Sequence, residues 1–142
     1  MARQPLRIVP YCSEPFIGVE TLWRECFPDD PARNHAAAAI PAKLAMGDDL
    51  FLVAEGSENE VIGTIMAGYD GHRGWLYSVA VRPDHRRTGT GTRLVEAACD
   101  RLKAFGCVKV NLQIRAGNEA VTAFYEALGF SVEPRTSMGR EL

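Results

Sequence analysis

The residues best suited to chemistry lie between an expected strand and an expected helix, at positions 82–94. Gly89 and Gly91 open the helix, in a segment that also carries Arg82, Arg86, Arg87 and Arg93. Glycine leaves backbone N–H groups accessible, and the first turn of a helix presents them at the positive end of its dipole. The pattern therefore predicts a cradle for an anion such as phosphate. A glycine loop beside solvated arginines has the same composition, so the local pattern alone leaves both interpretations open.

Two common phosphate motifs fit this loop less well. A P-loop requires Gly-Lys-Ser/Thr, which the segment lacks, and a dinucleotide fingerprint requires a third glycine where Leu94 stands. The preceding strand also belongs to an expected antiparallel hairpin rather than to a β-α-β series. Binding of another nucleotide through the same glycine loop stays open as the least favoured alternative.

Hydrophobic periodicity predicts the elements that position this loop. Short apolar runs predict strands over 5–12, 50–55, 60–69, 74–81 and 108–114, with one or two more from Phe130 onward. Helical spacing predicts helices over 16–26, 90–105 and 118–128, and one or two short helices within 28–47. Ser13 is the expected N-cap of the first helix, and the apolar stripe of the helix over 90–105 reaches Phe105. Turns are expected at 56–59 and 70–72. This order of elements predicts one α/β domain spanning residues 1–142.

Composition and charge narrow the classes of partner. The chain has 142 residues, of which 46% are hydrophobic and 24% charged, which suits one globular domain. Its formal net charge of −2 provides no overall positive field, so we expect neither nucleic acid nor a membrane as partner. Residues 1–60 carry −5 and residues 82–93 carry +3. The basic loop thus suits an anionic ligand, and the acidic part favours a cationic one.

The cysteine and histidine residues indicate neither a disulfide framework nor a metal site. Four cysteines lie at irregular separations without a C-x-x-C pair, at Cys12, Cys26, Cys99 and Cys107. With no secretory signal or long apolar run, we expect reduced thiols in the cytoplasm. Cys99 shares the apolar stripe of its helix and is interpreted as a packed core residue. The histidines lack ligand spacing, so no metal is expected; they are His35, His72 and His85.

Two motifs in sequence order carry a resemblance to a known family. Arg86-x-x-Gly89-x-Gly91 follows Val79-Ala80-Val81, and Asn118 precedes Phe124-Tyr125-Glu126-Ala127-Leu128-Gly129-Phe130. Together they resemble the GCN5-related N-acetyltransferase (GNAT) superfamily, and residues 63–74 and 138–142 are similar to a YpeA-like subgroup of small bacterial acetyltransferases. The resemblance implies a central mixed, mostly antiparallel sheet whose fourth and fifth strands splay apart around acetyl-CoA, flanked by about four helices.

The resemblance also assigns roles to individual residues. Backbone groups of Val79, Ala80 and Val81 would bond to the pantetheine and acetyl groups. The pyrophosphate would be surrounded by the loop and helix start, namely Arg86, Arg87, Thr88, Gly89, Thr90, Gly91 and Thr92. Asn118 suits a helix N-cap and, by family position, also a contact with the cofactor. Tyr125 lies on a packed helix face, and in the family this phenol protonates the departing CoA thiolate.

The general base is not identified by the sequence. Some relatives that act on protein N-termini have a glutamate on the fifth strand, but Gln113 stands there, and an amide cannot accept the proton. Other candidates are Tyr77 and Ser78 on the fourth strand and the carboxylates Glu25, Asp29 and Asp30. The expected function is direct acetyl transfer from acetyl-CoA to an amine-bearing substrate. A non-catalytic CoA-binding module of the same fold is the alternative, and a homodimer stays open.

Overall fold

In the computed structural model, which describes residues 6–142, the chain forms a five-stranded sheet and four α-helices. The strands are β1 (Arg7–Pro10), β2 (Phe51–Glu55), β3 (Val61–Tyr69), β4 (Gly74–Val81) and β5 (Val110–Leu112). The helices are α1 (Phe16–Cys26), α2 (Ala36–Leu44), α3 (Thr90–Ala104) and α4 (Glu119–Ala127), and short 3₁₀ turns lie at Ala32–Asn34, Ser57–Asn59 and Pro83–His85. The chain divides into two compact units: the first ends at Leu112 and contains the sheet, and the second, Gln113–Leu142, contains α4.

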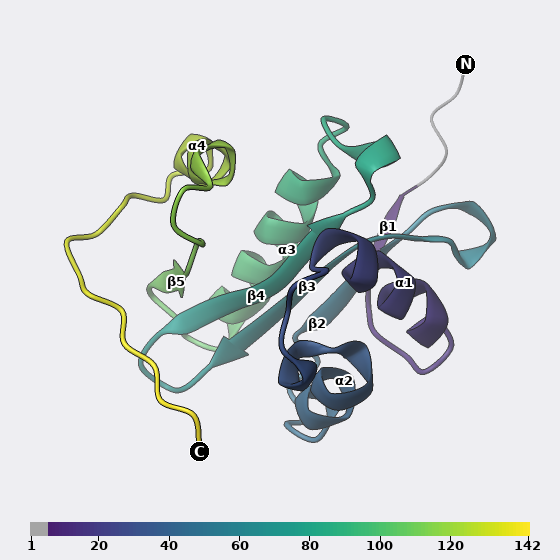
Figure 1. Ribbon diagram of the computed structural model, residues 1–142, viewed down its shortest axis with the longest axis horizontal. Helices are drawn as coiled ribbons and strands as arrows, with labels where there is room; N and C mark the ends of the chain where they lie inside the picture. The colour runs from purple at the N-terminus through teal and green to yellow at the C-terminus, as the bar shows by residue number, and fades with distance from the viewer. Residues whose placement is uncertain (1–5) are drawn as a thin grey trace. The chain divides into compact units, whose positions relative to one another are not determined.

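The strands lie in the sheet in chain order, β1-β2-β3-β4-β5. Pairing is antiparallel from β1 to β4, whereas β5 runs parallel to β4 after the crossover through α3 (Figure 1). β5 pairs only with Gly74–Leu76, the first residues of β4, and β4 continues to Val81 beyond the end of this pairing. The predicted α/β fold, with a mixed, mostly antiparallel sheet and splayed fourth and fifth strands, is confirmed.

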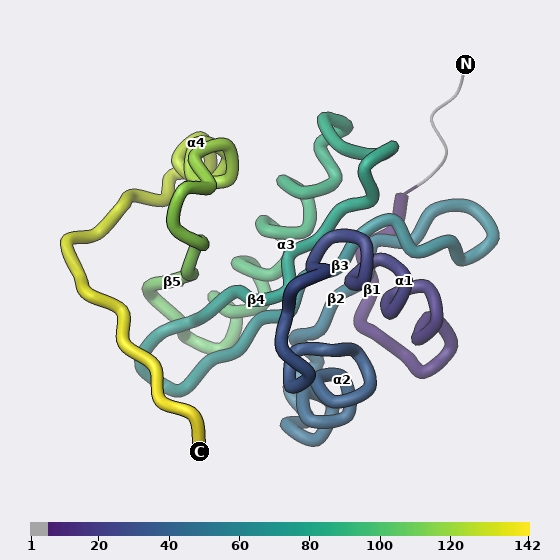
Figure 2. The backbone as a smooth tube through the Cα atoms, viewed as in Figure 1, coloured from purple at the N-terminus to yellow at the C-terminus, as the bar shows by residue number. Residues whose placement is uncertain are grey.

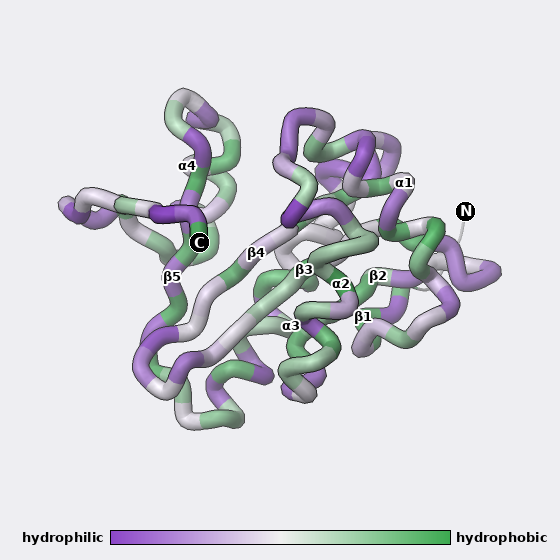
Figure 3. The backbone as a smooth tube through the Cα atoms, turned by 60° about the horizontal axis from the view of Figure 1, so that its bottom comes forward, coloured by the Kyte–Doolittle hydropathy of each residue, from purple (hydrophilic) through white to green (hydrophobic). Residues whose placement is uncertain are grey.

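Helices cover both faces of the sheet in the first unit, with α1 and α2 on one face and α3 on the other (Figure 1). Every residue of β2 is buried, because its successive side chains point to opposite faces of the sheet and helices cover both of these faces. Phe51 and Val53 join the core beneath α1 and α2, while α3 contributes buried residues such as Leu94 and Leu102. Hydrophobic and hydrophilic segments alternate along the helices, as expected for helices with one buried side (Figure 3). No helix within residues 6–142 is both long and apolar enough to cross a membrane.

β3 and β4 form the predicted hairpin, closed by a turn at Asp70. The Oδ1 atom of Asp70 accepts hydrogen bonds from the backbone N–H groups of His72 and Arg73, both at 2.7 Å. Gly71 takes a φ of 87°, a conformation that glycine adopts without steric cost. The other predicted turn, within residues 56–59, is present as the 3₁₀ turn between β2 and β3.

The second unit contains α4 and the C-terminal segment. Asn118 is the N-cap of α4, as predicted: its Oδ1 accepts a hydrogen bond from a first-turn N–H at 3.4 Å. At the other end of the helix, the N–H of Phe130 donates to the carbonyl of Tyr125 at 3.1 Å. Phe130 therefore closes the helix rather than opening a strand. The prediction of one or two strands after it is wrong, since residues 130–142 contain none.

Other boundaries also differ from the sequence-based expectation. Pro15, and not Ser13, is the N-cap of α1, because its carbonyl accepts the first helical hydrogen bond, from Val19. No side chain among the described residues caps this end. Phe105 lies just beyond α3 and is 55% exposed, so the buried stripe ends at Leu102. The first and fifth strands are shorter than predicted, and 28–47 holds one 3₁₀ turn and α2.

Candidate active site

The loop that joins β4 to α3 (Figure 2) contains two residues with positive φ. Arg87 takes a φ of 63°, and Gly89, the N-cap of α3, a φ of 84°. A Cβ added at Gly89 would meet no atom within 4 Å, so the space on that side of the loop is open. The positive end of the α3 dipole therefore adjoins an accessible position.

The first turn of α3 keeps its backbone N–H groups free of competing side chains. Within the described residues, this turn contains no acidic side chain, and Gly89 supplies no side-chain cap. Thr90 is buried, and its hydroxyl lies 2.9 Å from the hydroxyl of Thr88. The Thr88 hydroxyl donates a hydrogen bond to a carbonyl of the preceding 3₁₀ turn. Gly91 and Thr92 follow, both half-buried. The hydroxyls thus fix the loop, while the helix N-terminus stays suited to an anion.

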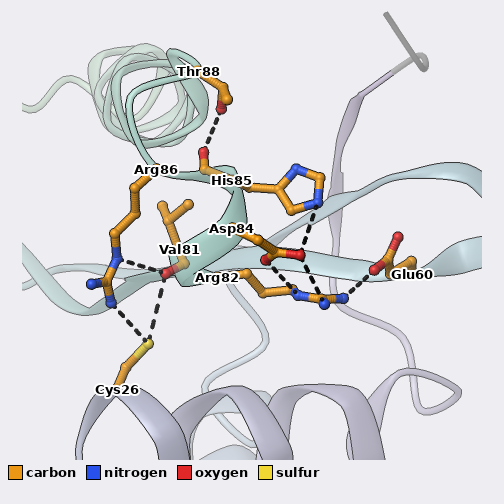
Figure 4. Close-up of polar contacts among 8 residues, drawn as sticks. All are labelled: Cys26, Glu60, Val81, Arg82, Asp84, His85, Arg86 and Thr88. Atoms are coloured by element: carbon orange, nitrogen blue, oxygen red, sulfur yellow. Dashed lines mark hydrogen bonds and ion pairs between the residues drawn. The ribbon is translucent and has the colours of Figure 1, made fainter.

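The four arginines of the loop differ in whether a carboxylate offsets their charge. Arg82 forms ion pairs with Glu60, which precedes β3, and with Asp84 at 3.2 Å (Figure 4). Arg93 donates from Nη2 to the backbone carbonyl of Leu6 at 3.1 Å. The two carboxylates offset the charge of Arg82, whereas a bond to a neutral carbonyl leaves the charge of Arg93 in place, so Arg86, Arg87 and Arg93 can all attract an anion.

Arg86 and Arg87, at the centre of the loop, are exposed. Arg86 donates from Nε to the carbonyl of Val81, the last residue of β4, at 3.3 Å. Its Nη2 lies 3.8 Å from Sγ of Cys26 at the end of α1, and the same thiol donates to the Val81 carbonyl at 3.8 Å (Figure 4). Helix α1 thus holds this guanidinium at the end of β4. Sequence reasoning missed Cys26, because 60 residues separate it from Arg86 and no motif marks the contact.

The Cys26 thiol is neutral near pH 7. Burial raises the pKa of Cys26 above its ordinary value, although the hydrogen bond and charge of Arg86 oppose the shift. A neutral thiol is a weak nucleophile, so Cys26 acts here as a hydrogen-bond and packing partner. Burial also raises the pKa of Cys99, a half-buried thiol on α3.

The C-terminal half of β4 contains the strand residues predicted to contact pantetheine. Val79 and Val81 are half-buried and Ala80 is buried. A β-bulge at Ser78 and Val79 opens this half of the strand, where the register with β3 shifts and Ser78 takes a φ of 49°. Pairing with β5 ends at Leu76, so within the described residues this half of β4 has a strand partner on one edge only. Its backbone groups are thus suited to bonding an extended ligand.

The candidates for the general base differ in their pKa and in their exposure. Burial, with the nearby negative charge of Asp70, raises the pKa of Tyr77, so this phenol stays protonated at neutral pH and is a poor base. Glu25 and Asp29 are exposed and Asp30 is half-buried, at and beyond the end of α1. No three His, Cys, Asp or Glu side chains within residues 6–142 form a group that could hold a metal ion.

The predicted acid belongs to the second unit. Tyr125 is 6% exposed and packs edge-on against Phe124 and Phe130, with ring centroids 5.0 Å and 5.5 Å apart. Its ring is thus on the buried side of α4, as the sequence predicts. The side-chain amide of Gln113 donates a hydrogen bond to the Ser137 hydroxyl, which leaves it in a structural role.

Comparison with known proteins identifies the family. The family described as "Acetyltransferase (GNAT) family" matches residues 16–130, most of the chain. An acetyltransferase of Sodalis glossinidius (strain morsitans) is 43% identical over 120 residues, which cover 83% of this chain and 82% of that protein. The chain therefore belongs to the acetyltransferase (GNAT) family, and it is an acyl-CoA-dependent N-acyltransferase.

Solved structures agree with this fold. The crystal structure of Ard1 from Thermoplasma volcanium matches with a TM-score of 0.80 at 20% identity, over 90% of this chain and 84% of that one. The aminoglycoside N-acetyltransferase AAC(6')-Iy, solved in complex with CoA, matches with a TM-score of 0.75 at 18% identity, over 99% of this chain and 97% of that one. At these identities the likeness shows a shared fold alone.

Proposed function

We propose that this acetyltransferase uses acetyl-CoA as acetyl donor and transfers the acetyl group directly to an amine, without a covalent enzyme intermediate. The observation that carries the proposal is the start of α3: a glycine N-cap with open space, a first turn without acidic side chains, and exposed Arg86 and Arg87 beside it. Helix N–H groups and guanidinium groups both favour phosphate oxygens. The loop thus suits the pyrophosphate of CoA, with Thr88–Thr92 around it.

Strand β4 and α4 supply the remaining proposed roles. Acetyl-CoA brings an activated thioester, and the backbone of Val79–Val81 polarises its carbonyl. Tyr125 donates a proton to the leaving thiolate, for which a phenol of ordinary pKa ~10 suffices when the site favours the transfer. Asn118 contacts the cofactor in addition to capping α4. We propose that both compact units form one acetyltransferase domain, which the family match across residues 16–130 supports.

We propose a cationic amine as the acceptor class. Residues 1–60, which include α1 and α2, carry −5, whereas residues 82–93 carry +3. An acidic surface attracts cationic substrates and raises their local concentration. We expect higher kcat/KM for amines with a second positive charge than for amines bearing a carboxylate, and the reverse order would contradict this part of the proposal.

The test measures thiol release from acetyl-CoA over a panel of amines, with wild-type protein and Tyr125→Phe. We expect turnover by the wild type and a fall in kcat of roughly a hundredfold in the variant, because general acid catalysis contributes about that much. Tyr69→Phe, at the hairpin end of β3, is the matched control and should retain wild-type kcat. An unchanged kcat in Tyr125→Phe would refute the acid role.

The alternative is a CoA-binding module without turnover. The lack of an identified general base favours it, since Gln113 and Tyr77 are both unsuited to accept a proton. Calorimetry with CoA, ATP and NAD separates these possibilities. CoA binding without turnover of any amine would favour the module, and binding of ATP or NAD as tight as that of CoA would refute the cofactor assignment.

A further inference from the structure

The bulge in β4 places a serine in a backbone conformation that side chains disfavour. In the register of β3 with β4, Thr64 pairs with Ala80 and Met66 pairs with Tyr77. Between these two pairs, two residues of β4 therefore stand opposite a single residue of β3. The first of the two, Ser78, takes a φ of 49°. A residue with a Cβ is strained there, and such a conformation persists only when its surroundings hold it.

Two buried hydrogen bonds, which together we call the relay, connect this residue to β3 and to α1. The Thr64 hydroxyl donates to the Ser78 carbonyl at 2.9 Å, and the indole Nε1 of Trp23, on α1, donates to the Thr64 hydroxyl at 2.8 Å. Thr64 is fully buried and Trp23 is 4% exposed. The hydroxyl therefore both donates and accepts in a buried environment, where loss of either partner is costly.

The relay acts on the part of β4 to which we assign the acetyl group. Ala80, the register partner of Thr64, is one of the residues whose backbone we assign to acetyl-CoA. The bond from Thr64 fixes the carbonyl of Ser78, and the peptide planes that follow Ser78 belong to Val79 and Ala80. A rotation at Ser78 would redirect these backbone groups.

We infer that Thr64 and Trp23 are positioning residues, which hold Ser78 in its left-handed conformation so that the backbone of Val79–Val81 is oriented for acetyl-CoA. This inference rests on the proposed function for the role of β4, and on the two hydrogen bonds for the role of the relay. Neither side chain needs to touch the cofactor. The alternative is that the relay only satisfies buried polar groups and stabilises the fold.

The first test compares Thr64→Val with Thr64→Ser. Valine keeps the shape but removes the hydroxyl, whereas serine keeps the hydroxyl. We expect Thr64→Val to weaken CoA binding and to lower kcat/KM for acetyl-CoA roughly tenfold, as misoriented groups do, while Thr64→Ser stays near wild type. Trp23→Phe should have a smaller effect, because it leaves the bond from Thr64 to Ser78. Unchanged CoA affinity in a folded Thr64→Val protein would overturn the inference.

The second test separates positioning from stability. Glycine adopts a positive φ without strain and alanine does not, although both remove the Ser78 hydroxyl. In the Thr64→Val background we expect Ser78→Gly to restore CoA affinity at least in part and Ser78→Ala to leave it weak. Equal affinities of the two double variants would contradict the positioning role.

The two tests also distinguish this inference from the proposed function. If wild-type protein does not bind CoA, the proposed function fails, and the relay is then judged on the free protein. Backbone amide NMR shifts of residues 78–81 should move in Thr64→Val and return in Thr64→Val/Ser78→Gly. Shifts that stay unchanged in Thr64→Val would show that the relay does not hold the bulge.

Discussion

The two halves of β4 differ in their surroundings although they form one strand. Gly74–Leu76 is paired on both edges, with β3 and with β5. Tyr77–Val81 begins at the bulge, and within the described residues only β3 pairs with it. The first half therefore fixes the strand in the sheet, and the second presents backbone groups beside the loop that leads into α3. A single strand can thus combine a rigid anchor with an open edge suited to binding.

Two glycines mark this difference, since each allows a close approach to a different half. A Cβ at Gly74 would lie 2.9 Å from side-chain atoms of Cys107 and Leu102. A Cβ at Gly63, on β3, would lie 2.7 Å from the backbone carbonyl oxygen of Ala80. The first glycine allows packing on side chains, and the second allows β3 to approach the backbone of the open half.

Gly63→Ala should have the largest effect, because a backbone oxygen cannot move aside as a side chain can. We expect a loss of about 3 kcal/mol in the free energy of unfolding, the upper end for overpacking, together with weaker CoA binding. Denaturant unfolding and calorimetry measure the two effects. A destabilised variant that binds CoA as tightly as wild type would break the proposed link between this half of β4 and the cofactor.

Gly74→Ala should reduce stability alone. The ends of Leu102 and Cys107 can move, so the expected loss is about 1 to 2 kcal/mol. Since the first half of β4 is assigned no ligand contact, the CoA affinity of the folded variant should equal that of wild type. A large loss of affinity here would mean that the two halves do not differ as described.

Arg86→Ala should weaken CoA binding without unfolding the protein. A charge-assisted hydrogen bond to phosphate contributes about 1.5 kcal/mol or more, so the dissociation constant should rise roughly tenfold. Arg24→Ala, an exposed arginine on α1 with the same change in net charge, is the matched control. Equal affinities of the two variants would show that net charge, and not the loop, attracts the cofactor.

The smallest expected effect concerns the thiol beside Arg86. Burial raises the pKa of Cys26, and Arg86 partly offsets this by favouring the thiolate. Removing Arg86 should therefore raise this pKa further, so alkylation of Cys26, followed by peptide mass mapping, should require a higher pH. A shift to lower pH would contradict the contact between the two side chains.

Much of the fold follows from local sequence patterns. Alternation in β3 and β4, the stripe in α3 and the Asp-Gly turn each depend on neighbouring residues, and the structure contains all of them. The prediction of a strand from Phe130 is wrong, because an apolar residue after a glycine can also close a helix. Phe105 matches the period of α3 but lies beyond its end, where the helix no longer directs it to the core.

The relay and the Arg86 contact could not be predicted in this way. Trp23 is 41 residues from Thr64, and Thr64 is 14 residues from Ser78 across the bulge. Each contact depends on the exact register of β3 with β4, and a shift of one residue would turn Thr64 to the other face of the sheet. A threonine within an apolar strand was the available signal, because a buried hydroxyl requires partners.

The most direct measurement is an NMR titration of the protein with CoA, following backbone amide shifts. We expect large shift changes at Val79–Val81 and at residues 88–92, with small changes at Gly74–Leu76. Changes spread equally over both halves of β4, or absent from the start of α3, would contradict the assignment of the open half and the loop to the cofactor.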